Sequence, residues 1–334
     1  MEDIHDVLDA IDSTSSGGVL ATVVQVTGSA YKKEGASMLF QPDGTQIGLL
    51  SAGCLEEDLA ERLKGSEARY EEVVYDMRGE DELSWGEGSG CNGVISVWTE
   101  KLDDAYIQHL LKLKGVLQTG QSVVMMKKRG EAPGYLFIPE EGEPFGSWAG
   151  GVPDDCKVIE RGMFYSRALG GEVYVQRIRP KRRLIVFGAG PDARPLVSFA
   201  AGAGFSVTVC DWRPALCHNT CFPAAERRII GFPNELLTQI EVKPDDCVVI
   251  MTHNFKRDQE LLQVLKGKEM RYLGVLGSKK RTARLLGSDS IPAHITSPAG
   301  LAIQAEGAEE IAVSIVAQLI QVSHAVKLKE AVCL

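Results

Sequence analysis

The chain has no surplus of positive charge. Its 36 Lys and Arg residues are outnumbered by 45 Asp and Glu residues, and the formal net charge is −9 at pH 7. Proteins that hold nucleic acid neutralise its phosphates with clustered cations, which a surplus of acidic residues opposes. We therefore do not expect nucleic acid as a partner.

Long apolar runs are also missing. No stretch approaches the roughly 20 apolar residues that span a bilayer, so we expect no membrane partner. The first six residues are acidic and lack the positive flank and apolar stretch of a signal peptide, which predicts a cytoplasmic protein. The eight cysteines in 334 residues are too sparse for a disulfide scaffold, and we expect mostly reduced thiols.

The composition is sufficient for two hydrophobic cores. A chain of 334 residues, 44% of them hydrophobic and 24% charged, exceeds the usual size of one core. From residue 183 to residue 334, short apolar segments alternate with helix-length segments; the apolar segments are 184–187, 206–210, 247–251 and 272–276. This order predicts an α/β fold, a Rossmann-type doubly wound parallel sheet.

Residues 1–178 form the other predicted domain, an N-terminal α+β domain. We expect helices at 4–11 and 54–63, a strand at 19–26, and a hairpin from 36–41 and 46–51. The middle stretch, 101–178, offers one helix and strand-like pieces at 122–127 and 172–178, but no motif that indicates a role. Residues 130–155, rich in Gly, Pro and Glu, are typical of hairpin loops or a mobile surface segment.

A glycine-rich turn follows the first strand of the second domain. Gly188 and Gly190 form a G-x-G-x-x-A pattern that allows a tight turn and lets a phosphate approach the start of a helix. Asp211 ends the next strand, where dinucleotide-binding folds place an acid against the ribose hydroxyls. Alternatively, the glycines serve only packing and Asp211 caps the following turn. Arg213 leaves a choice between NAD and NADP open.

Two later segments should reach the same edge of the sheet. Residues 252–254, with His253, and residues 277–281, with Ser278, follow predicted strands at their carboxyl ends. Ligands of open α/β sheets bind along this edge, so both segments are candidate pocket lining. The simpler alternatives are a loop histidine held by a backbone hydrogen bond and a solvated helix start.

Two thiols of the first domain have notable neighbours. Cys54 follows Gly53 at a predicted helix start, where the helix dipole favours thiolate, although Glu56 opposes that shift. Cys91 lies in a run with four glycines, which allow close approach to a ligand. Each thiol could instead be a small buried apolar residue. The pair Cys217 and Cys221 lacks the fourth ligand and the paired C-x-x-C of a zinc site.

Several segments together resemble the XdhC/CoxI family. Residues 51–56 are similar to its G-G-C-L-E segment, with Ala52 in place of the first glycine. Residues 88–93 are similar to its G-x-G-C-x-G segment, in which Asn92 is a second departure from the family's pattern. The similarity continues through the second domain, at residues 187–190, 211–214, 251–254, 272–278 and 297–301.

The resemblance implies binding of molybdenum cofactor in its molybdopterin form. It also implies protection of the cofactor while a terminal sulfur is installed with a cysteine desulfurase, and delivery to a xanthine dehydrogenase-type molybdenum hydroxylase. In this interpretation Cys54 and Cys91 carry the chemistry, with Cys54 also a molybdenum contact. The expected cofactor-binding residues are Gly53, Glu56, Gly188, Gly190, Asp211, Arg213, His253 and Ser278.

Two other functions remain open from the sequence. The unit from Gly188 to Asp211 would also suit an NAD(P)-dependent oxidoreductase, although beyond His253 no hydride-transfer constellation is recognisable. An assembly protein with a vestigial nucleotide site is a third possibility. We expect a homodimeric cofactor chaperone or sulfur-transfer scaffold rather than a turnover enzyme.

Overall fold

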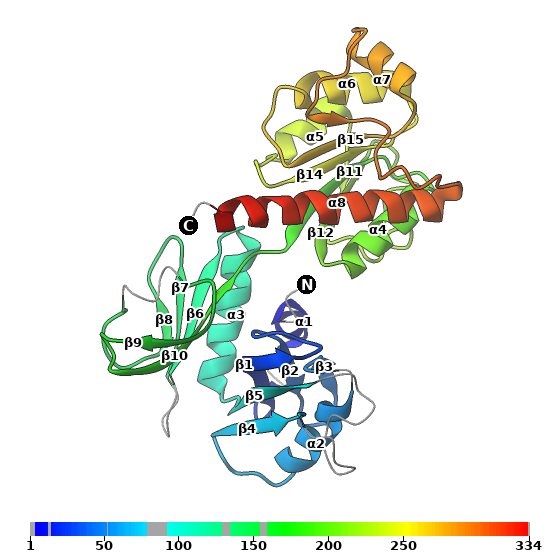
Figure 1. Ribbon diagram of the computed structural model, residues 1–334. Helices are drawn as coiled ribbons and strands as arrows, with labels where there is room; N and C mark the ends of the chain where they lie inside the picture. The colour runs from blue at the N-terminus through cyan, green and yellow to red at the C-terminus, as the bar shows by residue number, and fades with distance from the viewer. Residues whose placement is uncertain are drawn as a thin grey trace. The chain divides into compact units, whose positions relative to one another are not determined.

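The chain folds into two units in a computed structural model, Met1–Pro180 and Lys181–Leu334. The structure describes residues 4–12, 15–51, 53–78, 92–128, 134–153 and 159–332, and only the backbone of residue 54 and of residues 325–332. Each unit has its own sheets and helices (Figure 1).

The first sheet of unit 1 is antiparallel and has five strands in the order β3-β2-β1-β5-β4. β2 and β3 pair as the expected hairpin, with Met38 opposite Gly48. β1 lies at the centre of the sheet, as expected for its apolar β-branched sequence. The strands are β1 Val19–Ser29, β2 Ser37–Phe40, β3 Gln46–Gly48, β4 Tyr70–Asp76 and β5 Asn92–Lys101.

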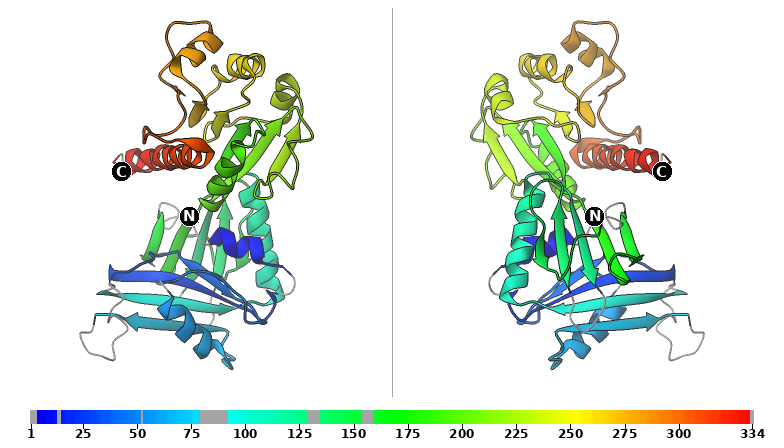
Figure 2. Two further views of the ribbon diagram at one scale, coloured as in Figure 1. Left: turned by 90° about the vertical axis from the view of Figure 1, so that its right-hand side faces the viewer. Right: turned by 90° about the vertical axis from the view of Figure 1, so that its left-hand side faces the viewer.

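Helices cover both faces of this sheet. Leu55 and Leu59 of α2 are fully buried against Val23 and Met38 on one face. α1 and α3 bury their apolar stripes in the core on the other face of the sheet (Figure 2). The helices are α1 Ile4–Ala10, α2 Cys54–Leu63 and α3 Asp104–Gln118.

A second antiparallel sheet, in the order β8-β7-β6-β10-β9, occupies the middle stretch. The prediction of hairpin loops or a mobile surface segment at residues 130–155 was wrong where β7 and β8 lie inside that range. The Gly, Pro and Glu residues that flank the two short strands concealed them. The strands are β6 Val123–Lys128, β7 Tyr135–Pro139, β8 Phe145–Ser147, β9 Arg161–Ser166 and β10 Gly171–Ile178.

A buried ion pair joins the two sheets of unit 1. Lys127 of β6 is 1% exposed and pairs with Glu100 of β5, which is 4% exposed. The ammonium also donates to Thr22 Oγ1 of β1 at 3.1 Å, and Tyr106 of α3 donates to Glu100 at 3.3 Å. Burial and the neighbouring Glu100 carboxylate raise the pKa of Tyr106, which keeps its hydroxyl protonated as a donor.

Unit 2 contains a six-stranded parallel sheet in the order β13-β12-β11-β14-β15-β16. This is the doubly wound order of a Rossmann-type fold, and the predicted fold class is confirmed. The strands are β11 Arg182–Phe187, β12 Phe205–Asp211, β13 Arg227–Ile230, β14 Cys247–Ile250, β15 Tyr272–Val275 and β16 Ile295–Thr296.

Helices bury both faces of the parallel sheet (Figure 1). Leu184 and Val186 of β11 point into the core beneath α4 and α8, while Ile185 and Phe187 point into the core beneath α5, α6 and α7. This two-sided burial explains the continuous apolar strands of the sequence. The helices are α4 Ala193–Gly202, α5 Pro233–Gln239, α6 Phe255–Leu265, α7 Lys279–Leu286 and α8 Gly307–Val332. Within the described residues, none of the helices is long and apolar enough to cross a membrane.

Replacing Lys127 with Met should destabilise unit 1 strongly. The variant leaves the Glu100 carboxylate buried without its counter-ion, and breaking a buried pair in this way costs about 3–5 kcal/mol. We expect that decrease in the free energy of unfolding, measured by urea denaturation. The double variant Lys127→Met with Glu100→Leu removes both charges and should regain most of the loss. A change within about 0.5 kcal/mol for the single variant, typical of a surface substitution, would contradict this role.

Candidate functional site at the carboxyl edge of the parallel sheet

The first residue of the glycine turn is constrained by backbone conformation and by a neighbouring strand. Gly188 has a φ of 123°, in the left-handed region where a side chain causes strain. A Cβ at Gly188 would lie 2.5 Å from the carbonyl oxygen of Met251, just after β14. Glycine is therefore required here for packing, whether or not a ligand binds.

Asp192 lies over the second glycine of the turn. A Cβ at Gly190 would come within 2.5 Å of Asp192 Oδ1. The other carboxylate oxygen, Oδ2, lies 2.6 Å from His253 Nε2. His253 has a φ of 58°, unusual for a residue with a side chain, and its side chain is 62% exposed. The pair connects the loops that follow β11 and β14.

Asp211, at the end of β12, is buried and bonded within the protein. Its Oδ2 accepts from Ala189 N at 2.7 Å, and the Arg213 side chain donates to both oxygens, at 2.9 and 2.8 Å. Burial raises the pKa of Asp211, but the hydrogen bonds from Arg213 and Ala189 outweigh that effect and hold the pKa below its ordinary value. The ionised carboxylate thus fixes the glycine turn and Arg213 together.

Arginines stacked on aromatic rings extend the site from Arg213. The Arg213 guanidinium lies 4.5 Å from the ring centroid of Trp212, and the Arg257 guanidinium lies 4.6 Å from that of Phe232. Arg257 also lies 5.9 Å from Trp212, so the four side chains are contiguous. We call them the arginine shelf. It offers positive charge and flat apolar faces at one edge of the sheet.

A second buried carboxylate connects the loop after β14 with α7. Asp258 is 1% exposed and accepts from Thr252 Oγ1 at 2.5 Å and from Arg281 Nη2 at 2.6 Å. Ser278 caps α7 by accepting from Arg281 N at 3.2 Å. The expected edge residue Ser278 therefore has a structural bond in addition to any ligand contact.

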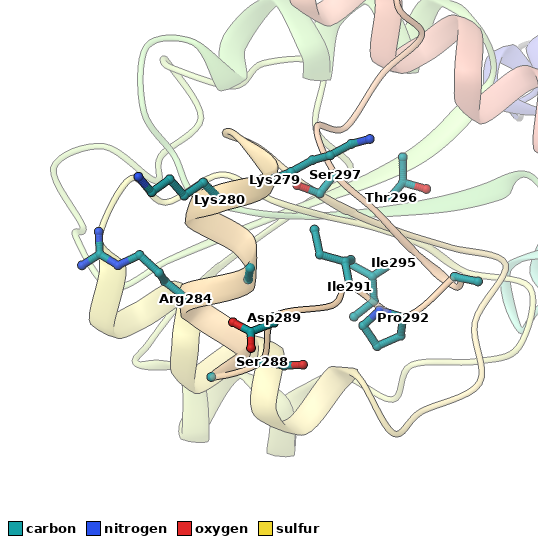
Figure 3. Close-up of a pocket in the computed structure, with 13 residues that line it drawn as sticks. Lys279, Lys280, Arg284, Ser288, Asp289, Ile291, Pro292, Ile295, Thr296 and Ser297 are labelled. Atoms are coloured by element: carbon teal, nitrogen blue, oxygen red, sulfur yellow. The ribbon is translucent and has the colours of Figure 1, made fainter.

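An open pocket of about 1030 Å³ runs along α7 and the loop before β16 (Figure 3). Lys279, Lys280 and Arg284 are among its lining residues, as are the apolar Ile291 and Ile295. Lys280 and Arg284 extend to the side away from the two isoleucines (Figure 3). β14 and β15 lie between β16 and β11 in the sheet, so this pocket is separate from the glycine turn.

In unit 1, Glu56 holds the turn that leads into α2. The carboxylate is 5% exposed and accepts from Leu50 N at 2.9 Å and from both the amide and the hydroxyl of Ser51. Burial raises the pKa of Glu56, but these hydrogen bonds outweigh it and lower the pKa below its ordinary value. Gly53 has a φ of 117°, so the turn needs glycine there. The Cys54 backbone begins α2 at this point.

The remaining predictions for cysteines concern the thiols of Cys54 and Cys91 and the pair Cys217 and Cys221. Cys91 and the side chain of Cys54 lie outside the described residues and atoms. No cluster of three or more metal-ligating side chains occurs in the described part of the chain. Cys217 is buried with its Sγ 3.6 Å from the Val209 carbonyl oxygen, and Cys221 Sγ lies 3.2 Å from His218 Nε2.

Sequence reasoning missed several residues that the structure places at this edge. Asp192 follows the G-x-G-P sequence directly, and Trp212 precedes Arg213, so both were close to recognised motifs. Phe232 and Arg257 lie after β13 and β14, and only the strand order brings them together. Aromatic residues just after strand ends were the signal available in the sequence, and the structure leaves Phe232 45% exposed.

Asp211→Asn should loosen the glycine turn and make unit 2 less stable. Hydrogen bonds to a charged group contribute about 1.5–3 kcal/mol, so we expect a loss of that size at pH 7, measured by thermal or urea unfolding. The folded pKa of Asp211 is depressed, so its stabilisation is present above the unfolded pKa of about 3.9 and is lost as pH falls through the folded pKa. The difference between wild type and variant should therefore shrink in acid; a difference that stays constant or grows below about pH 4 would refute the assignment.

Comparison with known proteins matches three parts of the chain. Residues 184–319 match the model of the XdhC Rossmann domain, residues 14–75 that of the XdhC and CoxI family, and residues 104–179 that of a BH1974-like central domain.

Full-length relatives agree with these matches. The chain is 44% identical over 324 residues to a probable xanthine dehydrogenase subunit of Bacillus subtilis (strain 168), covering 96% of this chain and 98% of that protein. It is 26% identical to the molybdenum cofactor insertion chaperone PaoD of Escherichia coli (strain K12), covering 92% and 84%. The crystal structure of a xanthine dehydrogenase (BH1974) from Bacillus halodurans superposes with a TM-score of 0.84 at 47% identity, covering 97% and 96%. The chain belongs to the XdhC and CoxI family.

Proposed function

We propose that this protein binds molybdenum cofactor as cargo and delivers it to a xanthine dehydrogenase-type molybdenum hydroxylase. The names of two relatives support this proposal, one being a probable part of a xanthine dehydrogenase and the other a molybdenum cofactor insertion chaperone. Both align with more than nine-tenths of this chain. Binding and delivering a cofactor is the role of a carrier rather than of a turnover enzyme.

The arginine shelf is the observation that carries the proposal. Molybdopterin combines a flat pterin ring system with a phosphate tail. The guanidiniums of Arg213 and Arg257 can form forked hydrogen bonds to a phosphate, and the rings of Trp212 and Phe232 offer flat apolar surface. Both kinds of contact lie at the carboxyl edge, where open α/β sheets bind ligands.

The thiols of unit 1 are proposed to handle the sulfur of the cargo. Thiolates are soft ligands suited to a thiophilic metal centre, and Cys54 stands at the first residue of α2, where the helix dipole favours a thiolate. We assign sulfur handling to Cys54 and Cys91, with a cysteine desulfurase as sulfur donor. Gly53 and Glu56 set the geometry of the Cys54 turn. A cytoplasmic homodimer is part of this proposal.

The NAD(P)-dependent oxidoreductase alternative has less support. A dinucleotide fold normally uses the acid after its second strand to accept hydrogen bonds from ribose hydroxyls. Here both oxygens of Asp211 already accept hydrogen bonds from Ala189 and Arg213. Ribose would have to compete with an ionised pair for that carboxylate.

Removing the two guanidiniums of the shelf should abolish cargo binding. We expect wild-type protein mixed with molybdenum cofactor released from a molybdoenzyme to retain pterin after gel filtration, detected by fluorescence after oxidation. The double variant Arg213→Ala with Arg257→Ala, checked to be folded by circular dichroism because Arg213 also pairs with the buried Asp211, should retain at least about tenfold less. Each charged hydrogen bond contributes about 1.5–3 kcal/mol. Arg227→Ala, which removes an exposed arginine of β13, is the matched control and should bind like wild type. Equal retention by the double variant and the control, or no retention by wild type, would overturn the proposal.

Cys54→Ala should separate folding from function. An exchange at a helix start that removes one sulfur should change the free energy of unfolding by about 0.5 kcal/mol or less. We expect xanthine dehydrogenase apoenzyme to gain no activity from the variant protein loaded with cofactor, whereas Cys221→Ala, at a partly exposed thiol of unit 2, should activate normally. Full activation by Cys54→Ala would rule out its role in sulfur handling.

A further inference from the structure

The glycine turn after β11 has few amide donors for a phosphate. A phosphate at a helix start is held by free N–H groups of the turn and of the first helical residues. Here Ala189 N donates to Asp211 at 2.7 Å, and Ala193 N donates to the Gly190 carbonyl oxygen at 3.0 Å. Pro191 has no N–H. Of the positions from Ala189 to Ala193, only the amides of Gly190 and Asp192 have no acceptor within the described part of the chain.

A negative charge lies over the same turn. Asp192 stands at the N-cap of α4 but makes no side-chain cap bond to the helix. His253 holds Oδ2, whereas Oδ1 lies over Gly190, and within the described part of the chain no group donates to Oδ1. The side chain is 27% exposed and thus open to a ligand. A carboxylate in this position repels phosphate and accepts hydrogen bonds.

We infer that this turn recognises the hydrogen-bond-donor edge of the cargo's pterin ring, with Asp192 as the acceptor. The inference rests on the proposed function. The pyrimidine part of a pterin carries a 2-amino group beside a ring N–H, two adjacent donors that match the two oxygens of a carboxylate.

The phosphate tail of the cargo then belongs on the arginine shelf. The shelf begins next to Asp211, whose carboxylate accepts from Ala189 of the glycine turn, so the two parts of the site adjoin. The hydrogen bond to Asp211 raises the pKa of Arg213, and the Asp192 charge adds to that effect, which places Asp192 within electrostatic range of the shelf. The site therefore presents a carboxylate for the ring and guanidiniums for the phosphate.

Pterin and lumazine test the inference directly. The two compounds share size and shape, but lumazine carries a 2-oxo group where pterin carries the 2-amino group. We expect fluorescence titration of the full-length wild-type chain to show pterin binding at least about tenfold tighter than lumazine. The carboxylate accepts two hydrogen bonds from pterin, whereas in lumazine it accepts one from the ring N–H and faces the 2-oxo oxygen with its other oxygen. Equal affinities, or no detectable binding of pterin, would overturn the inference.

Two variants complete the test. Asp192→Asn keeps the size of the side chain but replaces one acceptor by a donor, and it should lose the preference for pterin. Asp245→Asn, at an exposed aspartate of the same unit, is the matched control and should keep it. A preference that survives in a folded Asp192→Asn variant, checked by circular dichroism, refutes the role of Asp192. The wild-type comparison of the two compounds stands even if that variant does not fold.

The experiments distinguish failure of this inference from failure of the proposed function. If molybdenum cofactor is retained in the gel-filtration assay but pterin and lumazine bind equally, the carrier role stands and only the orientation of the cargo is wrong. If molybdenum cofactor is not retained at all, the carrier role itself fails.

Discussion

The Asp211 carboxylate is the group on which the candidate site depends. It is 1% exposed, and one ionised side chain holds both the glycine turn, through Ala189 N, and the guanidinium of Arg213. An unpaired charge at this depth would be strongly unfavourable. Arg213 therefore stabilises the fold as well as presenting positive charge to solvent. In the proposed function, structure and ligand binding are coupled, because the residue proposed to face the ligand also keeps the turn in place.

The sequence predicted the features of unit 2 that depend on local patterns. Continuous apolar strands and a glycine turn at the end of the first of them indicate the fold, and the position of Asp211 follows from spacing alone. The contact between Asp192 and His253 spans 61 positions and could not be predicted. It requires β14 to lie beside β11 and requires a left-handed backbone at His253. Both are properties of the assembled sheet.

In unit 1 the limits of prediction have another cause. Short strands such as β7 and β8 have no room for a clear alternation of apolar and polar residues, and their glycine-rich surroundings are typical of loops. Glu56 presents the opposite case, since the family resemblance implied a ligand contact for it. The structure shows why an acid is needed there, because two amides and a hydroxyl at Leu50 and Ser51 converge on it. The sequence indicated that Glu56 is a special position, but not that its carboxylate accepts hydrogen bonds within the turn.

The arginines of the shelf are already paired with carboxylates, which matters for a carrier. Arg213 binds Asp211, and Arg257 lies 2.8 Å from Glu260 Oε2. A phosphate on the shelf therefore meets guanidiniums whose charge is partly neutralised, and the gain on binding is smaller than with unpaired arginines. A turnover enzyme gains from holding its cofactor permanently, whereas a chaperone must release its cargo to the next protein. Moderated affinity at the phosphate, combined with specific hydrogen bonds at the ring, would let such a protein select its cargo without retaining it.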